Sequence, residues 1–342
     1  EYIIYVHPSW KRPLTLGDNF AVKKFDARPV SLATLFQLSG AVRREKPDLL
    51  HSLFPLTPLF YRGPMLATLY DLQALLVPEF TGKRHFLVRR AYDLFYRFTY
   101  ATTVRRARYM IAASEATRLD IARVFPRHAN RTIVVHPGIA AEELADCPPE
   151  LIDHTRHRYA LPDRYILYIG STRPNKNLPN AIRAYALAVR ERAELSDVAL
   201  VLVVTPDRFF ADCQKLIQTL GIGERVLIYR SISEDEKKAF YRASQALYLV
   251  TKYEGFGLPL LEAQACSTPV LAANHAALPE TGGDSALFVD PDDPQAIARG
   301  LERILIDEQL RRELVEKGRH NLGRFRWRKT IKTILQIYNY LF

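Results

Sequence analysis

The sequence is poor in the residues that build metal centres and disulfide frameworks. Its 342 residues include only three cysteines, Cys147, Cys213 and Cys266, which are far apart, odd in number and without the spacing of a zinc site. The nine histidines show no pair at zinc spacing either. These absences argue against a disulfide-rich secreted protein and a zinc hydrolase, and they favour a reducing cytoplasm.

Long apolar runs and triphosphate-binding loops are also missing. No window reaches the roughly 18 uncharged apolar residues of a membrane span, and the first residues do not resemble a basic-plus-apolar signal. No glycine loop followed by Lys-Ser or Lys-Thr occurs, so an NTPase has no support. The segment "LGIGERV" holds two of the three dinucleotide-fingerprint glycines and follows a helical stretch, so we reject it as a cofactor loop.

Acidic residues are scarce in the first half of the chain. Residues 1–160 carry 23 Lys and Arg against 15 Asp and Glu, whereas residues 161–342 carry 25 against 22, within a total net charge of +11. The first half therefore predicts an anionic partner: nucleic acid, lipid headgroups or a phosphorylated acceptor. Composition does not separate these three.

One basic segment, "GKRHFLVRRAYDLFYRFTYATTVRRAR" at residues 82–108, interleaves eight Lys and Arg with six Phe and Tyr around a single acid, Asp93. It fits an amphipathic face for anionic lipid or nucleic acid. It also fits a helix that buries its aromatic side chains against a sheet and leaves its arginines in water. We favour the second interpretation, because a membrane role needs a free apolar face.

The order of elements predicts an α/β protein with two doubly wound, Rossmann-like domains. A chain of this length usually exceeds one core. Short β-branched or aromatic runs alternate with helical stretches, and the pattern restarts near residue 160. We assign residues 1–158 to a first domain, 159–322 to a second, and 323–342 to a helix that returns to the first. Ligands of such domains bind beyond the carboxyl ends of the strands, in a cleft between the two.

The expected elements can be placed along the chain. The first half predicts strands near residues 2–6, 48–54, 65–70, 109–114 and 132–137, with helices at 31–46 and 83–106. The second half predicts strands at 165–171, 199–205, 225–229, 246–251, 269–274 and 286–290, with helices starting near Leu178, Phe209, Glu234, Pro259 and Asp293.

The stretch "EGFGLPLLEAQACSTPV" places two glutamates eight positions apart across a glycine-rich loop that opens a helix. Gly255 and Gly257 allow a sharp turn close to a ligand, and Pro259 suits the first helical turn. Glu254 then precedes the helix while Glu262 lies about one turn inside it. The unpaired amides around Phe256 to Leu260 are expected to form a donor cluster for a phosphate or sugar oxygen. An ordinary strand-loop-helix junction with surface glutamates is an equal alternative on these residues alone.

The segment "YILYIGSTRPNKNLPNAIRAYALAV" predicts a buried strand, a polar loop and a helix. Arg173 and Lys176 lie in the loop at the carboxyl end of the strand, where a cation would neutralise a diphosphate. A solvated basic loop is the alternative.

Together, these two elements and their order resemble the retaining glycosyltransferases of family 4, which have the two-domain GT-B fold. The glutamates of "EGFGLPLLE" match the family's pair separated by seven residues, and "LYIGSTRPNKNLPNAIRAY" matches its phosphate loop. The stretch from "ISEDEKKAFYRA" through "EGFGLPLLEAQACSTPVLAAN" to "PDDPQAIARGLERIL" follows the family pattern almost continuously, and "TLYDLQALLVPE", "MIAASEATRLDI" and "VVHPGI" look like its weaker first-domain signatures.

The resemblance implies transfer of a sugar from a nucleotide-diphosphate donor with retention at the anomeric carbon and without a metal or other cofactor. Glu262 would accept hydrogen bonds from the ribose, Glu254 would hold the sugar ring, and Lys176 aided by Arg173 would stabilise the leaving diphosphate. Asp71 would orient the acceptor or sugar. The remaining donor-binding residues would be Gly170, Ser171, Tyr229, Arg230, Gly255, Phe256, Gly257 and Leu258.

The chain departs from the family pattern at three places. Ser171 and Asn175 stand where members often have arginine, and Tyr70-Asp71 stands where many have a His-Asp pair. The family's first strand and the glycine-rich loop after it are expected to be absent from this sequence.

We therefore expect a cytoplasmic glycosyltransferase of bacterial polysaccharide or glycolipid assembly, with a UDP- or GDP-sugar donor, a saccharide or lipid-linked acceptor, and no nucleic-acid partner. Association with an anionic membrane surface at the inner face of the cell membrane stays open. A nucleotide-sugar epimerase of the same fold and a non-enzymatic nucleic-acid- or partner-binding protein are the alternatives.

Overall fold

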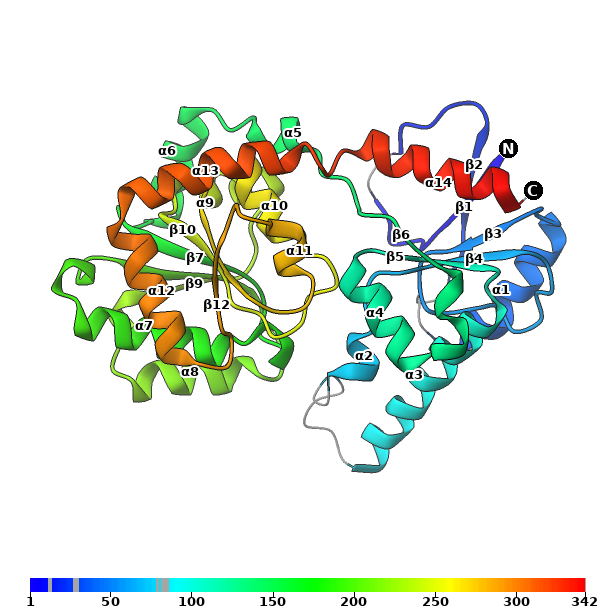
Figure 1. Cartoon of the computed structure of the whole chain (residues 1–342), viewed down its shortest axis with the longest axis horizontal. Coiled ribbons are helices and arrows are strands. Elements are labelled where there is room, and N and C mark those ends of the chain that lie inside the picture. Colours follow the sequence, from blue (N-terminus) through cyan, green and yellow to red (C-terminus); the bar gives the residue numbers. More distant parts are fainter. Residues whose placement is uncertain (12–13, 27–30, 78–79, 81–85, 342) are drawn as a thin grey trace.

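Two α/β domains, each with its own parallel sheet, make up the chain in a computed structural model that describes residues 1–11, 14–26, 31–77, 80 and 86–341 (Figure 1). The first-domain sheet has the order β3-β4-β5-β6, and the second-domain sheet has the order β12-β11-β10-β7-β8-β9. The first-domain strands are β3 Leu50–Ser52, β4 Met65–Leu69, β5 Tyr109–Ala112 and β6 Thr132–Val134. The second-domain strands are β7 Tyr165–Ser171, β8 Ala199–Thr205, β9 Val226–Tyr229, β10 Ala246–Leu249, β11 Val270–Ala273 and β12 Leu287–Val289. A separate parallel pair joins β1 Tyr2–Val6 to β2 Phe20–Lys24.

The second-domain sheet is buried on both faces, as expected for parallel strands covered by helices. Within β7, Ile166 and Tyr168 enter one apolar cluster, while Tyr165 and Leu167 enter the cluster on the opposite face. The helices of this domain are α7 Leu178–Glu191, α8 Phe210–Thr219, α9 Glu234–Ala243, α10 Leu258–Ala265, α11 Leu278–Gly282, α12 Pro294–Ile306 and α13 Glu308–Leu322. Short 3-10 turns occupy Pro126–Arg131, Pro174–Lys176, Ala193–Leu195 and Gly223–Arg225.

Two first-domain helices begin at serine caps. Ser31 accepts a hydrogen bond from the amide of Thr34 at the start of α1 (Leu32–Glu45), and Ser114 accepts one from the amide of Thr117 at the start of α4 (Glu115–Val124). Each cap satisfies an amide that the helix leaves without a partner. The other helices of this domain are α2 Gln73–Leu76 and α3 Phe86–Arg106.

The chain crosses between the domains earlier than the predicted boundary after residue 158. Helices α5 (Ala141–Ala145) and α6 (Pro149–Tyr159) both follow β6, yet they pack against the second domain. Leu144 and Tyr159 join its apolar cluster, and Lys238 donates hydrogen bonds to the carbonyls of Glu143 and Asp146. The crossing therefore lies at residues 135–140, where no change of composition marks it.

Helix α14 (Trp327–Leu341) returns to the first domain (Figure 1). Its Ile337 and Leu341 pack with Leu66 of β4, and the hydroxyl of Tyr338 lies 2.6 Å from Nδ1 of His51. Just before α14, Arg326 forms a parallel bridge with Ile139, whose amide donates to the Phe325 carbonyl at 2.9 Å. The returning segment is therefore hydrogen-bonded to the outgoing one where both cross between domains.

The preference for a packed helix over residues 83–106 is only partly correct. Residues 83–85 lie outside the described part of the chain. Tyr100 is buried against the sheet, but Phe86, Tyr92 and Phe98 are exposed. The reason is geometric, because α3 extends past the edge of the small first-domain sheet and only its last turns contact it (Figure 1). Across the described residues, no helix is long and apolar enough to cross a membrane.

Candidate active site

The glycine loop before α10 is fixed through its carbonyl groups. The Glu254 carbonyl accepts from the amide of Ala277, and the Gly255 carbonyl accepts from the hydroxyls of Ser114 at 2.7 Å and Thr117 at 3.2 Å. The Phe256 carbonyl accepts from the hydroxyl of Thr281, and the Gly257 carbonyl accepts from the amide of Leu260. Four consecutive carbonyls are thus held by groups from both domains.

The amides of the same loop are left available. No cis peptide occurs in the described chain, and in a trans peptide the N–H points away from the C=O of the same plane. The amides of residues 255 to 258 donate to no acceptor among the described residues. The amide of Leu260, expected in the same donor cluster, is not free, because it donates to the Gly257 carbonyl within the loop. Gly257 has φ of +101°, which a side chain would disfavour. The loop therefore presents four donors at the N-terminus of α10, a site suited to anionic or hydroxyl oxygens.

Lys176 and Glu254 lie together at the edge of this loop. Nζ of Lys176 is 2.5 Å from Oε1 of Glu254, and both side chains are mostly buried. Asn175, next to Lys176, holds the two loops together: its carbonyl accepts from the amides of Lys252 and Tyr253, and its side chain donates to the Tyr253 carbonyl. Asn175 thus ties the phosphate-loop candidate to the segment between β10 and Glu254.

Asp71 reaches the same place from the first domain. A side chain at Gly255 would clash with the carbonyl of Tyr70 and come within 2.7 Å of Asp71 Cβ, so the two loops touch. The Asp71 carboxylate accepts from the amide and the side chain of Gln73 at 3.0 and 3.1 Å. Burial raises the pKa of Asp71 above its ordinary value. The hydrogen bond from the Gln73 amide lowers this pKa, the negative charge of Glu254 raises it further, and the positive charge of Lys176 lowers it. The structure therefore brings together Asp71, Lys176 and Glu254 as a half-buried charged cluster.

Glu262 occupies the first turns of α10, as predicted from the spacing. Its Oε1 lies 3.1 Å from Nζ of Lys237, and its Oε2 accepts from the hydroxyl of Tyr241 at 3.0 Å. Both partners belong to α9, which sequence reasoning did not connect with this glutamate. Since a carboxylate has about four acceptor positions, two remain for a ligand.

The remaining predicted residues surround this region in different ways. Gly170 and Ser171 end β7, directly before the loop that carries Arg173, and the exposed Arg173 guanidinium lies 5.8 Å from the centre of the Phe80 ring. Tyr229 instead points into the domain, where its hydroxyl donates to the Tyr159 carbonyl at 2.6 Å. Arg230 is exposed and lies over the ring of Phe210.

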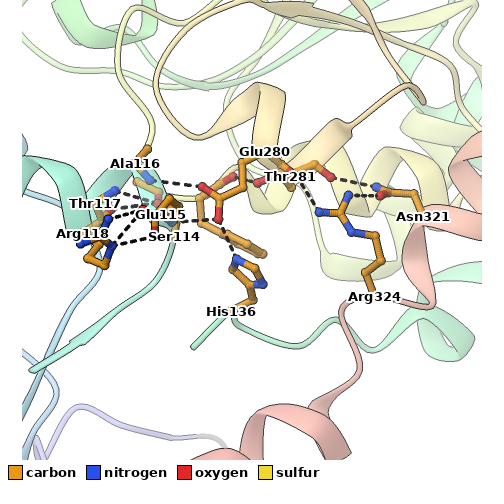
Figure 2. A network of polar contacts seen from close by, with 12 residues as sticks. Ser114, Glu115, Ala116, Thr117, Arg118, His136, Glu280, Thr281, Asn321 and Arg324 are labelled. Atoms are coloured by element: carbon orange, nitrogen blue, oxygen red, sulfur yellow. Dashed lines mark hydrogen bonds and ion pairs between the residues drawn. The ribbon is translucent and has the colours of Figure 1, made fainter. Parts of the chain in front are cut away.

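Glu280 was not predicted, and it joins the two domains beside the loop (Figure 2). Its carboxylate accepts from the amides of Glu115 at 2.8 Å and Ala116 at 3.2 Å, at the first turn of α4, and lies 2.7 Å from Nε2 of His136. Burial would raise the pKa of Glu280, but the hydrogen bonds from His136 and the two amides outweigh it and hold the pKa below its usual value. The second domain thus supplies an anion to a first-domain helix N-terminus.

Tyr253 makes a second unpredicted contact between the domains. Its hydroxyl donates to Asp120 of α4 at 2.7 Å and accepts from the amide of Leu72 at 3.1 Å. Burial, followed by the bond to Asp120, raises the pKa of this hydroxyl. In the sequence, the only available signal for the α4 contacts was the Ser-x-x-Thr spacing of Ser114 and Thr117, which predicts a helix cap but not its partner.

Comparison with known families matches nearly the whole chain. The family described as glycosyl transferases group 1 matches residues 152–321, and the one described as Glycosyltransferase Family 4 matches residues 7–143. Both descriptions favour a glycosyltransferase over the epimerase and the nucleic-acid-binding alternatives.

Curated relatives agree with these families. The serotype-specific mannosyltransferase WbdA of Escherichia coli is 30% identical over 65% of this chain and 29% of its own length. The D-inositol 3-phosphate glycosyltransferase of Salinispora arenicola is 31% identical over 69% of this chain and 55% of its own length. The chain therefore spans between about a third and somewhat more than half of the length of these relatives.

Solved structures share the fold. Sucrose-phosphate synthase from Thermosynechococcus elongatus superimposes with a TM-score of 0.75 at 21% identity, covering 99% of this chain and 88% of that one. Anabaena HepE, solved in complex with UDP and glucose, gives a TM-score of 0.74 at 19% identity over 93% of this chain and 86% of that one. Both matches extend across the two domains.

Proposed function

The chain belongs to the family 4 glycosyltransferases of the two-domain GT-B fold, and from this membership we propose that it transfers a sugar from a UDP- or GDP-sugar to a saccharide or lipid-linked acceptor. Relatives named as mannosyltransferases and as a D-inositol 3-phosphate glycosyltransferase support a role in polysaccharide or glycolipid assembly. The complex of HepE with UDP and glucose supports a nucleotide-sugar donor.

The loop before α10 is the observation that carries the proposal. Its carbonyls are tied to both domains, so the amides of Gly255, Phe256, Gly257 and Leu258 are oriented before any ligand arrives. Sugar hydroxyls and diphosphate oxygens are the acceptors that such amides bind, and the positive end of α10 favours negative charge. Because the donors are already oriented, little reorganisation accompanies binding.

Charge compensation falls to two side chains of the phosphate loop. Negative charge grows on the diphosphate as the bond to the sugar breaks. A fixed cation in a partly dry site stabilises that charge more than it stabilises the intact donor. Lys176 is held beside Glu254, and Arg173 precedes Lys176 in the same loop. We assign Lys176 to the leaving diphosphate with Arg173 as its helper, and Glu254 to the sugar ring. This assignment needs no metal.

Glu262 is assigned to the ribose. Its two oxygens are oriented by Lys237 and Tyr241, which leaves acceptor positions for the two ribose hydroxyls. Gly170 and Ser171 would line the diphosphate side. We assign Arg230 to the base, whereas Tyr229 would act through its ring because its hydroxyl is already bonded to Tyr159.

Transfer with retention follows from attack on the face from which the diphosphate leaves. The bond from the anomeric carbon to the phosphate oxygen breaks, the acceptor oxygen bonds to that carbon on the same face, and the acceptor proton passes to the departing phosphate oxygen. Asp71, which lies against Gly255, would orient the acceptor hydroxyl. We place the reaction in the cytoplasm, at the inner face of a membrane, because residues 1–160 carry 23 basic against 15 acidic residues.

Thermal unfolding in the presence of UDP, GDP and their sugars tests the donor site, since a ligand that binds only the folded state raises the melting temperature. We expect one nucleotide series to raise it at millimolar concentration. Release of the nucleoside diphosphate in the presence of an acceptor then tests transfer. If no nucleotide or nucleotide-sugar raises the melting temperature, the donor-site assignment fails.

A further inference from the structure

Helix α3 exposes six large apolar or aromatic side chains, Phe86, Leu87, Val88, Tyr92, Leu94 and Phe98, and three of them form a stripe along one line of the helix. Leu87, Leu94 and Phe98 are 66%, 60% and 49% exposed. At about 100° per residue, these three positions fall within roughly 40° of one another around the helix axis. Apolar side chains seldom line up in this way on the water-facing side of a helix, where polar residues are usual.

The stripe points away from the protein. The buried residues of α3 are Thr99, Tyr100, Thr103 and Val104. Their mean direction lies roughly 170° around the helix from the stripe, by the same angular spacing. The stripe is therefore not a continuation of the face that packs on the sheet, whereas Phe86 and Tyr92 continue that face beyond the part that is buried. Figure 1 shows α3 projecting from the first domain.

Arginines accompany the stripe. Helix α3 contains five arginines and one aspartate. Exposed Arg90 and Arg97 lie about 60–80° to one side of the stripe, and Arg105 continues its line. An apolar stripe bordered by long cationic side chains is the arrangement of helices that lie in the plane of an anionic membrane, with the apolar face among the acyl chains and the guanidinium groups at the headgroups.

From this complementarity we infer that α3 docks the protein on an anionic lipid surface. A polyanion such as nucleic acid would use the arginines but not the two leucines. The inference deepens the proposed function and rests on it only for the identity of the acceptor, since a lipid-linked acceptor is presented at such a surface. The buried side of α3 also reaches the candidate site, because the hydroxyl of Tyr100 donates to the Asp71 carbonyl at 3.2 Å. The helix thus connects the lipid-facing surface with the acceptor side of the cleft.

Vesicle flotation of the whole chain tests the inference. Binding is compared on phosphatidylcholine alone and on phosphatidylcholine with about 30% phosphatidylglycerol. The apolar variant carries Leu87→Gln, Leu94→Gln and Phe98→Gln, and the charge variant carries Arg90→Gln and Arg97→Gln. We expect the wild type to prefer anionic vesicles, the apolar variant to bind at least tenfold more weakly, and the charge variant to lose about fivefold for each arginine.

Ile331→Gln on α14 is the matched control. Ile331 is 51% exposed, and α14 packs on the opposite face of the first-domain sheet from α3, so this variant should bind vesicles as the wild type does. Nucleotide binding in lipid-free buffer should be the same in all variants. This second readout separates the two proposals. If the wild type bound vesicles but no nucleotide, only the donor-site proposal would be refuted.

Three results would overturn the docking inference. The wild type could bind nucleotide yet ignore anionic vesicles. Binding could depend on the arginines but not on the apolar stripe, which would indicate a polyanion or an acidic protein as the partner. The control on α14 could lose as much binding as the apolar variant, which would place the lipid contact elsewhere.

Discussion

Replacing Glu262 by alanine should have two separable effects, because this carboxylate has a structural and a ligand-facing part. Its Oε2 is the acceptor for the hydroxyl of Tyr241, a side chain with no exposed surface. Its Oε1 lies 3.1 Å from Lys237, which also contacts Glu234 at 2.8 Å. Removal of the carboxylate therefore leaves the tyrosine hydroxyl without an acceptor, while the lysine keeps one.

The two magnitudes follow from these contacts. A buried hydroxyl left without a partner lowers the free energy of unfolding by about 1–3 kcal/mol. For a domain of this size that corresponds to a fall in melting temperature of roughly 2–12 °C. Loss of the ribose hydrogen bonds should weaken donor binding by about 1–3 kcal/mol, or roughly 5- to 150-fold.

The assay compares nucleoside diphosphates with and without ribose hydroxyls. Wild-type protein should bind the 2′,3′-dideoxy nucleotide more weakly than the ordinary one, and Glu262→Ala should bind the two equally. Tyr241→Phe is the control for stability: it removes the hydroxyl and leaves the carboxylate in place, so it should keep the discrimination between nucleotides. Thermal unfolding without ligand measures the structural part in each variant.

The ribose assignment would be refuted if Glu262→Ala still discriminated against the dideoxy nucleotide by the wild-type factor. Equal nucleotide affinity in wild type and variant, together with a lowered melting temperature, would reduce Glu262 to a structural partner of α9.

Three further predictions concern charge, closure and pH. Lys176→Ala should lower turnover about a hundredfold and donor affinity much less, because its charge acts mainly on the leaving diphosphate; steady-state kinetics with direct nucleotide titration measure both. Gly255→Ala should lower turnover at least tenfold, because the new methyl group meets the Tyr70 carbonyl and keeps the domains from closing; small-angle scattering should show a larger radius of gyration. Burial lowers the pKa of His51 from 6.5 to about 4. The free energy of unfolding should therefore fall by roughly 1–3 kcal/mol as the pH decreases from 6.5 to about 4. Acid denaturation curves measure this fall, and His51→Gln should lack the part that His51 contributes.

Each of these has an outcome that contradicts it. Equal losses in turnover and donor affinity for Lys176→Ala would indicate simple ground-state binding. Gly40→Ala, which adds a methyl group in open space on α1, is the control for Gly255→Ala, and the closure argument fails if both behave alike. For His51, the neutral form is the one favoured by folding, so stability should be highest above pH 6.5; parallel acid curves for the wild type and His51→Gln would refute the burial argument.

Elements governed by local pattern could be predicted from the sequence. Helix α1 was expected over 31–46 and occupies Leu32–Glu45, with Ser31 as its cap, and β7 was expected over 165–171 and occupies those residues. In both cases the signal is local: a helical period with a serine cap for α1, and a short apolar run for β7. Strand β2 was missed because its residues are exposed and carry no alternation between apolar and polar positions.

At the candidate site, the sequence predicted the local conformation of each motif but not its contacts with distant parts of the chain. The loop of Gly255 could be recognised from the sequence as a bend before a helix. The sequence did not indicate that Ser114 and Thr117 of the other domain donate hydrogen bonds to the Gly255 carbonyl. Tyr229 was expected among the donor-binding residues, and the sequence did not indicate that its hydroxyl bonds to the Tyr159 carbonyl, because such a partner is distant in sequence. The assigned roles of the individual residues remain predictions.

The hydrogen-bonded crossing at Ile139 and Arg326 has a mechanical consequence. Two covalent connections joined side by side form a strap rather than a single swivel, and Gly138 leaves no room for a side chain against the backbone of Trp327. Two connections paired in this way allow bending about one axis and oppose rotation about the other axes. The second domain should therefore rotate towards the first about a single hinge axis and return Gly255 to the same position beside Tyr70 at each closure.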